Sequence, residues 1–291
     1  MKKIFKSEEG KQEVLKRYQE ILSSWPVENK QYKVDTSFGS TFVIESGSND
    51  NPPLILLHGS VSNSFCWYSD VITFSKTHHV YAIDLIGEAG FSDPNRPTYE
   101  SGDYSSWLDE TFKSLSLKTC SIVGLSLGGW MALDFATTYP DKVEQLVLLC
   151  PGGLAKTKSS FLWKNLFLSL LGKWGKKQAM KLVYNDATPS VSTSDMKSAL
   201  EFTQLISKHF NPRLEKLPVF DGVSLSKLTM PIQVIFGERD NLIPAQKSIN
   251  HLKRFTSQTN DTLLPNTGHV VVNQSSRILE FLESNKLKPS K

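Results

Sequence analysis

A serine between two glycines, placed where a strand is expected to pass into a helix, constrains the fold of this chain more than any other feature. Gly124-Leu125-Ser126-Leu127-Gly128 follows the apolar run 121–123 and precedes residues 131–136, which favour a helix. Side chains on either side of so tight a turn would collide, and the two glycines remove them. The pattern predicts a nucleophile elbow, with the Ser126 hydroxyl clear of its own backbone at a helix N-terminus. A glycine-rich turn with a solvent-exposed serine is the alternative, and the rest of the chain must decide.

Apolar runs and amphipathic segments alternate along most of the chain. The unbroken run 54–57 suits a strand buried on both faces, which is typical of a parallel sheet. An N-terminal amphipathic helix is expected at 8–25 and an antiparallel pair at 32–34 and 41–45. The alternation predicts an α/β fold with a doubly wound, mostly parallel sheet. Its further strands are expected at 80–83, 121–123, 143–149, 232–236 and 262–264, and its helices at 65–75, 104–115, 127–138, 245–255 and 275–284.

One region, residues 152–227, breaks the alternation because it contains no β-like run. Apolar residues at near-helical spacing, and the helix-start residues Ser192, Thr193 and Ser194, predict a helical insertion between two strands. We therefore expect three parts along the chain. Residues 1–151 form the first part of the core with the N-terminal helix, residues 152–228 form a helical cap or lid, and residues 229–291 form the second part of the core.

The expected cap is rich in aromatic and basic residues. Phe161, Trp163, Phe167 and Trp174 could cover an acyl pocket, or they could only pack the lid onto the core, and both interpretations stay open. Residues 156–181 contain seven lysines and no acidic residue. A solvated lid face is favoured over attraction to an anionic lipid surface or an acidic substrate.

Size and composition exclude several classes of protein. The 291 residues suffice for one large domain with an insertion, and a net charge of +4 does not indicate nucleic acid binding. Neither a zinc-like cysteine–histidine spacing nor a phosphate-binding glycine loop is present, so no metal and no cofactor are expected. The sequence leaves the oligomeric state open. The three cysteines are expected to be small buried hydrophobic residues of a cytoplasmic protein: Cys66, Cys120 and Cys150.

A serine needs a base, and the base needs a carboxylate to orient it. Of six histidines, His269 is the best candidate because it follows the last expected strand and so reaches the same sheet edge as Ser126. Asp240 directly follows the strand at 232–236, whereas the end of the strand at 143–149 carries no carboxylate. Ser126, Asp240 and His269 are therefore predicted to form a catalytic triad.

The oxyanion of such a reaction needs hydrogen-bond donors. The backbone N–H of Leu127, at the start of the helix after Ser126, is the first expected donor. The second should come from the loop His58-Gly59-Ser60-Val61, where Gly59 permits close approach of the backbone. The N–H of Ser60 is preferred and that of Val61 is the alternative. His58 is expected to shape this loop rather than to act as a base.

These motifs together resemble the α/β-hydrolase superfamily, in its serine-nucleophile, carboxylesterase-like form with a helical cap. The resemblance covers about residues 38–282 and rests on the elbow 124–129, His58-Gly59, the turn 237–240 and Gly268-His269. The segment 84–93 matches as well, with one departure. Members usually have one residue between its two glycines, whereas Glu88 and Ala89 stand between Gly87 and Gly90 in this chain. The departure alters a loop near the expected rim of the pocket.

The resemblance implies acyl transfer to water through an acyl-enzyme, with Ser126 as nucleophile and His269 as general base. A small-molecule ester with a small or medium hydrophobic acyl group is the expected substrate. Hydrolysis of a carbon–carbon bond in a diketone is an alternative, since Ser60 after His58-Gly59 is similar to that branch of the superfamily. Thioester hydrolysis and acyl transfer are also open, and so is a signalling protein that binds a ligand with an intact triad.

Overall fold

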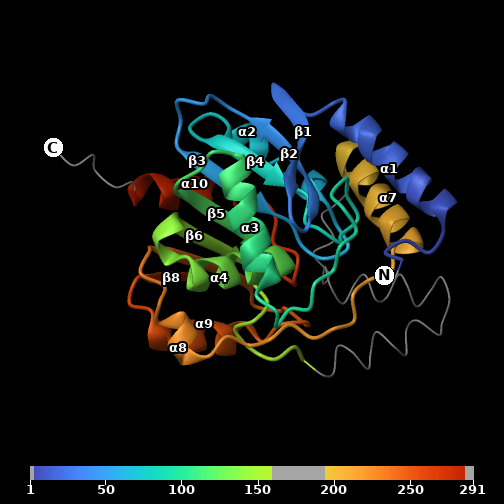
Figure 1. Cartoon of the computed structure of the whole chain (residues 1–291). Coiled ribbons are helices and arrows are strands. Elements are labelled where there is room, and N and C mark those ends of the chain that lie inside the picture. The colour runs from blue at the N-terminus through green and yellow to red at the C-terminus, as the bar shows by residue number, and fades with distance from the viewer. Residues whose placement is uncertain (1–2, 159–193, 286–291) are drawn as a thin grey trace.

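The structure, a computed structural model, describes residues 3–158 and 194–285. Its centre is a sheet of eight strands in the order β1-β2-β4-β3-β5-β6-β7-β8 (Figure 1). The pairs β1–β2 and β2–β4 are antiparallel, and all pairs from β4 to β8 are parallel. This confirms the predicted doubly wound, mostly parallel sheet. The strands are β1 (Asn29–Thr36), β2 (Gly39–Ser46), β3 (Pro53–Leu57), β4 (His79–Ile83), β5 (Cys120–Leu125), β6 (Val143–Leu149), β7 (Ile232–Gly237) and β8 (Thr259–Leu264).

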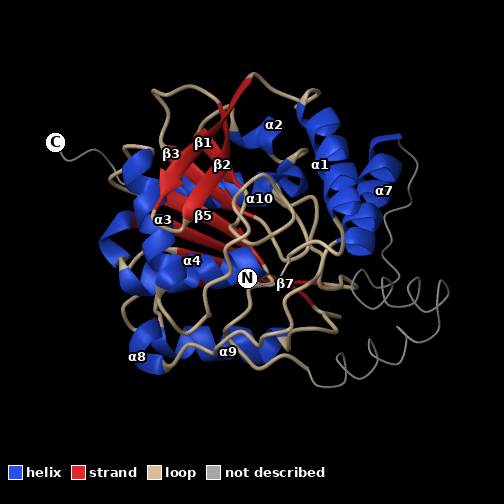
Figure 2. Ribbon diagram, turned by 45° about the vertical axis from the view of Figure 1, so that its right-hand side comes forward, coloured by secondary structure: helices blue, strands red, loops and turns tan. Residues whose placement is uncertain are grey.

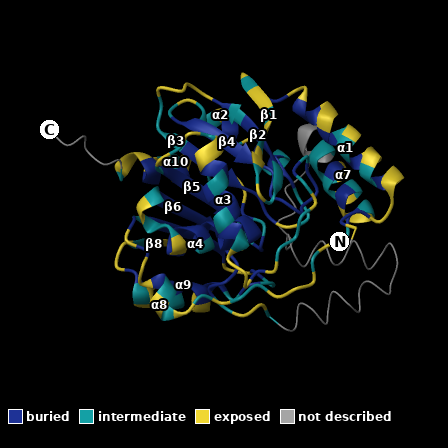
Figure 3. Ribbon diagram, viewed as in Figure 1, coloured by how far each residue is buried: buried dark blue, intermediate teal, exposed yellow. Residues whose placement is uncertain are grey.

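Burial along the strands explains their sequences. The central strands β3, β5 and β6 are buried almost throughout, as expected for unbroken apolar runs between two helical layers (Figure 3). The edge strands β1 and β8 have no fully buried residue, and they carry charged side chains. Charges on an edge strand discourage pairing with the edge of another sheet.

Helices pack on both faces of the sheet. The contacting helices α3 and α4 lie on one face, and the contacting helices α2 and α10 lie on the other (Figures 1 and 2). The helices are α1 (Glu8–Leu22), α2 (Val71–Phe74), α3 (Asp103–Ser114), α4 (Leu127–Thr138), α7 (Ser194–His209), α8 (Gly222–Leu225), α9 (Ala245–Phe255) and α10 (Ser275–Ser284). Two 3-10 helices, η1 (Ser64–Trp67) and η2 (Pro140–Lys142), complete the described elements.

The order of the strands creates a topological switch point between β3 and β5, at the centre of the sheet. The chain passes from β3 to β4 on one side and later returns to β5 on the other side of β3. The loops that leave β3 and β5 therefore diverge, and open α/β sheets bind ligands at the carboxyl ends of such strands. Both the 58–61 loop and Ser126 follow these two strands.

Helix α1 and helix α7 form a pair at the side of the molecule (Figure 2). The ring of Tyr18 in α1 stacks on Phe202 of α7 with 5.9 Å between ring centroids. Arg17 donates a hydrogen bond to the Ser198 hydroxyl over 2.7 Å. A Cβ on Gly10 would lie 2.3 Å from Nδ1 of His209, so the absence of a side chain at Gly10 allows α1 and α7 to approach each other closely.

The expected helix at 65–75 is wrong as a single element. The structure has η1 and the short helix α2 there, separated by Tyr68, Ser69 and Asp70. The Asp70 side chain caps no backbone N–H of α2 and instead accepts a hydrogen bond from the distant Ser275 hydroxyl, so contacts from outside the segment set its path. The N-terminal helix likewise ends at Leu22, before the two serines that precede Trp25, and not at residue 25 as expected.

The expected cap is described only in part. Residues 152–158 and 194–228 contain α7 and α8 and no strand. Residues 159–193 lie outside the described residues, and with them Phe161, Trp163, Phe167, Trp174 and five of the seven lysines. The division into 1–151, 152–228 and 229–291 stays a prediction. In the described ranges, no helix combines the length and the apolar character that crossing a bilayer requires.

Candidate active site

Ser126 occupies a strained turn between β5 and α4. Its backbone has φ 52° and ψ −104°, outside the regions that non-glycine residues ordinarily adopt. A Cβ on Gly124 would lie 2.5 Å from the carbonyl oxygen of Gly128, and one on Gly128 would lie 2.2 Å from that of Leu57. The Ser126 N–H donates to the carbonyl of Leu149 over 2.8 Å, which fixes the turn to β6. The elbow can therefore form because glycine, which has no side chain, occupies both positions.

The three predicted side chains meet at the carboxyl edge of the sheet. Ser126 Oγ lies 3.0 Å from Nε2 of His269, and Nδ1 of the same ring lies 2.7 Å from Oδ2 of Asp240. Asp240 follows β7, and His269 follows β8 in the loop 265–274. Ser126 follows β5, so the three side chains come from the carboxyl ends of β5, β7 and β8, which lie on the same edge of the sheet with β6 between β5 and β7.

Asp240 is held as an anion inside the protein. Burial alone would raise its pKa, but the hydrogen bond and charge of His269 and two backbone N–H groups lower the pKa below its usual value. Those N–H groups, from Leu242 and Ile243, donate to Oδ1 over 2.7 and 2.9 Å. A carboxylate only accepts, so His269 carries its proton on Nδ1 and offers a lone pair on Nε2 to the Ser126 hydroxyl. The arrangement can remove a proton from a serine.

Cys150 stands where a carboxylate would otherwise be expected, at the end of β6. One ligand atom each of Cys150, Asp240 and His269 lies within 4.8 Å of the others, so this group could in principle hold a metal ion. Burial, and next the charge of Asp240, raise the pKa of the Cys150 thiol well above its usual range. Asp240 and His269 already bond to each other, so a metal ion at this place would have to replace that hydrogen bond. The raised pKa makes the Cys150 thiol a neutral neighbour of the Asp240 carboxylate.

The loop after β3 runs close to the serine. A Cβ on Gly59 would lie 3.6 Å from Cβ of Ser126. The buried His58 ring shapes this loop, because Nε2 accepts the N–H of Leu85 over 2.9 Å and Nδ1 lies 2.7 Å from the Gly59 carbonyl oxygen. The Val61 N–H donates to a carboxylate oxygen of Glu88 over 2.6 Å. Of the two candidate donors in this loop, Val61 is therefore occupied, which favours Ser60 beside Leu127.

The other histidines lie in other parts of the structure. Each has a partner of its own and none is paired with Ser126 in the part of the chain that the structure describes. His251 is half-buried in α9, and its Nε2 lies 2.9 Å from the Phe220 carbonyl oxygen. The remaining partners are Thr77 for His78, Glu45 for His79 and Glu13 for His209.

Glu88 is a residue whose contact with the site the sequence reasoning missed. The pattern had marked it only as an extra residue between two glycines near the rim. The structure buries it to 3% exposure against the loop that follows His58. The signal that could have found it is a charged residue in a segment whose neighbours, Ile86 and Ala89, are apolar and buried.

Comparison with known proteins identifies the family. A model of the alpha/beta hydrolase family matches residues 54–283, which include the strands from β3 (all but its first residue) to β8 and all three residues of the predicted triad. The chain belongs to the α/β-hydrolase family.

Among α/β-hydrolases, several similar proteins come from Bacillus subtilis. An uncharacterized carboxylesterase, nap, is 30% identical over 87% of this chain and 85% of its own. The carboxylesterase YbfK is 29% identical over 91% of this chain and 92% of its own, and a crystal structure of it aligns with a TM-score of 0.80 over 94% and 98% of the two chains. A naproxen esterase structure aligns with a TM-score of 0.79 at 27% identity over 92% and 96%.

Proposed function

We propose that this α/β-hydrolase is a carboxylesterase in which Ser126 is the nucleophile, His269 the general base and Asp240 the residue that orients the base. The observation that carries the proposal is the continuous line of hydrogen bonds from Ser126 Oγ through the His269 ring to Asp240. Similarity to the carboxylesterases nap and YbfK supports ester hydrolysis over the other reactions that the same triad can perform.

The reaction follows from the roles of the three groups. Ser126 Oγ attacks the ester carbonyl carbon while its proton passes to Nε2 of His269. The N–H groups of Leu127 and Ser60 are the donors that would stabilise the resulting oxyanion. His269 then gives the proton to the departing alcohol, which leaves an acyl group on Ser126. Water attacks this acyl group in the second half, and the acid and the free serine are released.

The proposed substrates are esters of small or medium hydrophobic acids. A naproxen esterase, of similar fold and 27% identical, has a name that points to an aromatic acid of medium size. Chromogenic p-nitrophenyl esters from acetate to palmitate cover this range and extend beyond it. A maximum at acetate to hexanoate supports the proposal, and a maximum at palmitate or activity on an acidic diketone alone contradicts it.

Replacement of the nucleophile tests the mechanism. We expect Ser126→Ala to lower kcat for p-nitrophenyl butyrate by at least about a thousandfold, because no other group can form the acyl-enzyme. The glycine-controlled turn does not depend on the hydroxyl, so the circular dichroism spectrum and Tm should stay near those of the wild type. Retention of most of the activity by this variant would remove Ser126 as the nucleophile.

A further inference from the structure

Glu88 places a buried carboxylate beside the loop that is proposed to stabilise the oxyanion. The residue follows β4 in the segment where two residues, and not one, separate Gly87 from Gly90. Its side chain accepts the N–H of Val61 over 2.6 Å. Val61 directly follows Ser60, so the contact lies one peptide from the proposed second donor. The departure from the usual spacing of the family thus brings a charged group to the back of the oxyanion site.

Val61 needs such a partner because its backbone is strained. Its φ is 57°, in the left-handed region that a β-branched residue rarely adopts. Such a conformation costs about 1–3 kcal/mol and persists only where the surroundings enforce it. A short hydrogen bond from the Val61 N–H to a carboxylate is a strong restraint of this kind.

The bond from Val61 belongs to a set that joins the loops after β3 and β4. The Leu85 N–H donates to His58, and the Asn63 side chain donates to the Ala89 carbonyl over 2.8 Å. The N–H of Ser64 donates to Asp84 over 2.8 Å. Glu88 supplies the contact of this set that lies next to Ser60.

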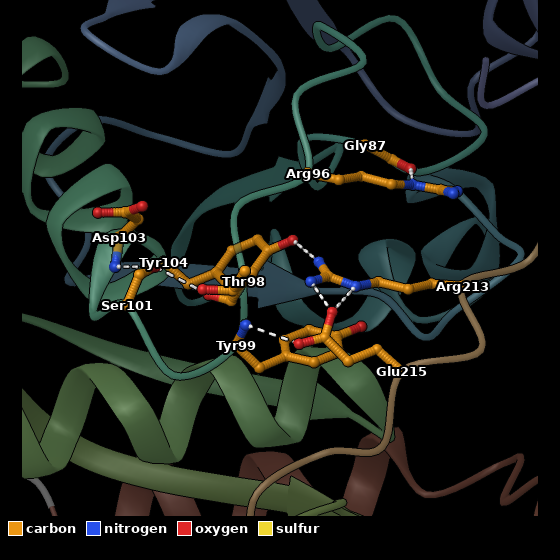
Figure 4. A network of polar contacts seen from close by, with 9 residues as sticks. All are labelled: Gly87, Arg96, Thr98, Tyr99, Ser101, Asp103, Tyr104, Arg213 and Glu215. Carbon is orange, nitrogen blue, oxygen red and sulfur yellow. Dashed lines mark hydrogen bonds and ion pairs between the residues drawn. The ribbon is translucent and has the colours of Figure 1, made fainter. Parts of the chain in front are cut away.

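Two arginines and two tyrosines, Arg96, Arg213, Tyr99 and Tyr104, lie near enough to Glu88 to interact with it electrostatically. Arg96 donates to the Gly87 carbonyl over 2.8 Å, and the guanidinium of Arg213 lies 3.8 Å from the centre of the Tyr99 ring and donates to the Tyr104 hydroxyl (Figure 4). Burial raises the pKa of Glu88 to about 7, against the opposing effects of the Val61 N–H and the charges of Arg96 and Arg213.

We propose that Glu88 is a positioning residue for the oxyanion site: its carboxylate accepts the Val61 N–H, holds the left-handed turn and thereby keeps the Ser60 N–H directed at the reacting carbonyl. The proposal rests on the proposed esterase function. The carboxylate does not touch the substrate and acts only through the loop.

Two variants separate the position of the acceptor from its charge. Glu88→Gln keeps an acceptor oxygen at the same reach, and Glu88→Asp keeps the charge but withdraws it by one methylene. With p-nitrophenyl butyrate at pH 8 we expect kcat of Glu88→Gln within about threefold of the wild type. Glu88→Asp should lose about 10- to 100-fold in kcat with little change in KM, since a misdirected donor affects the transition state. Below pH 7, kcat should fall more steeply in the wild type than in Glu88→Gln. The wild-type carboxylate becomes a protonated carboxyl group, which is a weaker acceptor than either the carboxylate or the amide oxygen of glutamine, whereas the amide does not change.

Asp134→Asn is the matched control. This residue lies in α4, eight positions after Ser126, and burial raises its pKa to about 6. Its replacement removes a similar charge without touching the 58–61 loop, so the shape of its pH profile should remain that of the wild type. The inference is overturned if Glu88→Asp keeps full kcat, if Glu88→Gln loses as much as Glu88→Asp, or if Asp134→Asn changes the profile as Glu88→Gln does.

A second readout separates this inference from the proposed function. Phosphonylation of Ser126 by a fluorophosphonate probe builds negative charge at the same place and needs no ester substrate. Slower labelling of Glu88→Asp than of Glu88→Gln supports the positioning role even if no ester is turned over, and equal labelling rates overturn it. Absence of ester turnover by the wild type contradicts the proposed function alone.

Discussion

At the scale of single residues, Glu88 has an energetic cost that can be measured. Its pKa is about 7 in the folded protein, against an ordinary value of 4.5. Between these pH values the folded state holds a proton that the unfolded state has released, so the free energy of unfolding falls as the pH rises. The difference corresponds to about 3 kcal/mol above pH 7, at 1.36 kcal/mol per pH unit.

Glu88→Gln should therefore be more stable than the wild type at pH 8.5, by up to about 3 kcal/mol, and nearly equal to it at pH 4.5. Urea unfolding at the two pH values measures the difference. Asp134→Asn serves as the comparison and should gain less, because the pKa of Asp134 is raised to about 6 only. Equal gains of Glu88→Gln at both pH values would show that its burial does not destabilise the anion.

The residues of the triad could be predicted because each lies in the turn or loop that follows a strand. Parallel strands end at one edge, so Ser126, Asp240 and His269 had to lie near one another once the strands were recognised. The contact between Glu88 and Val61 could not be predicted in this way. It depends on the conformations of two loops and on the left-handed backbone conformation of Val61, which no sequence pattern predicts.

At the scale of elements, the elbow depends on the close approach of α4 to β3. A Cβ on Gly128 would meet the backbone of Leu57 and His58 at 2.2 to 2.6 Å, and backbone cannot move aside as a side chain can. We expect Gly128→Ala to lower the free energy of unfolding by at least about 2 kcal/mol, as overpacking of a rigid site does.

Gly59→Ala is the control for this prediction. The nearest atom to its added Cβ lies at 3.6 Å, an ordinary contact, so its stability should stay within about 0.5 kcal/mol of the wild type. Chemical denaturation of both variants gives the comparison. A Gly128→Ala protein as stable as Gly59→Ala would mean that the helix can shift away from β3.

Strands were easier to predict than short helices. The buried strands can be recognised in the sequence as apolar runs, and the expected range 143–149 agrees with β6 at both ends. The segment 65–75 has the composition of a helix, yet its path is set by contacts with distant residues. The Ser64 N–H bonds to Asp84, and the Ser275 hydroxyl bonds to Asp70 at the start of α2.

At the scale of the whole molecule, the N-terminal helix reaches the scaffold behind the active site. The hydroxyl of Tyr18 in α1 donates to the buried carboxylate of Asp84 over 2.9 Å, and the same oxygen receives the N–H of Ser64. Local periodicity indicated the helix but not this docking place, because the partner lies 66 residues away in the chain.

Tyr18→Phe tests this connection. Loss of a hydrogen bond to a buried charge should lower the free energy of unfolding by about 1.5–3 kcal/mol. Tyr32→Phe is the matched control, since the Tyr32 hydroxyl donates to Glu45 over 2.7 Å at a half-buried site near the sheet edge, and it should lose less than about 1 kcal/mol. Similar losses in both variants, measured by urea unfolding, would contradict a special role for the Tyr18 contact.

The pairing of α1 with α7 has a consequence for the synthesis of the protein. Helix α1 ends at residue 22 and α7 begins at residue 194, so the 171 residues from 23 to 193 must be translated between them. At ribosomal speeds of about 5–20 residues per second this takes roughly 10–35 s. Throughout that interval the side of α1 that will contact Phe202 and His209 has no partner. In the nascent chain it must either be bound by a chaperone or remain exposed to solvent.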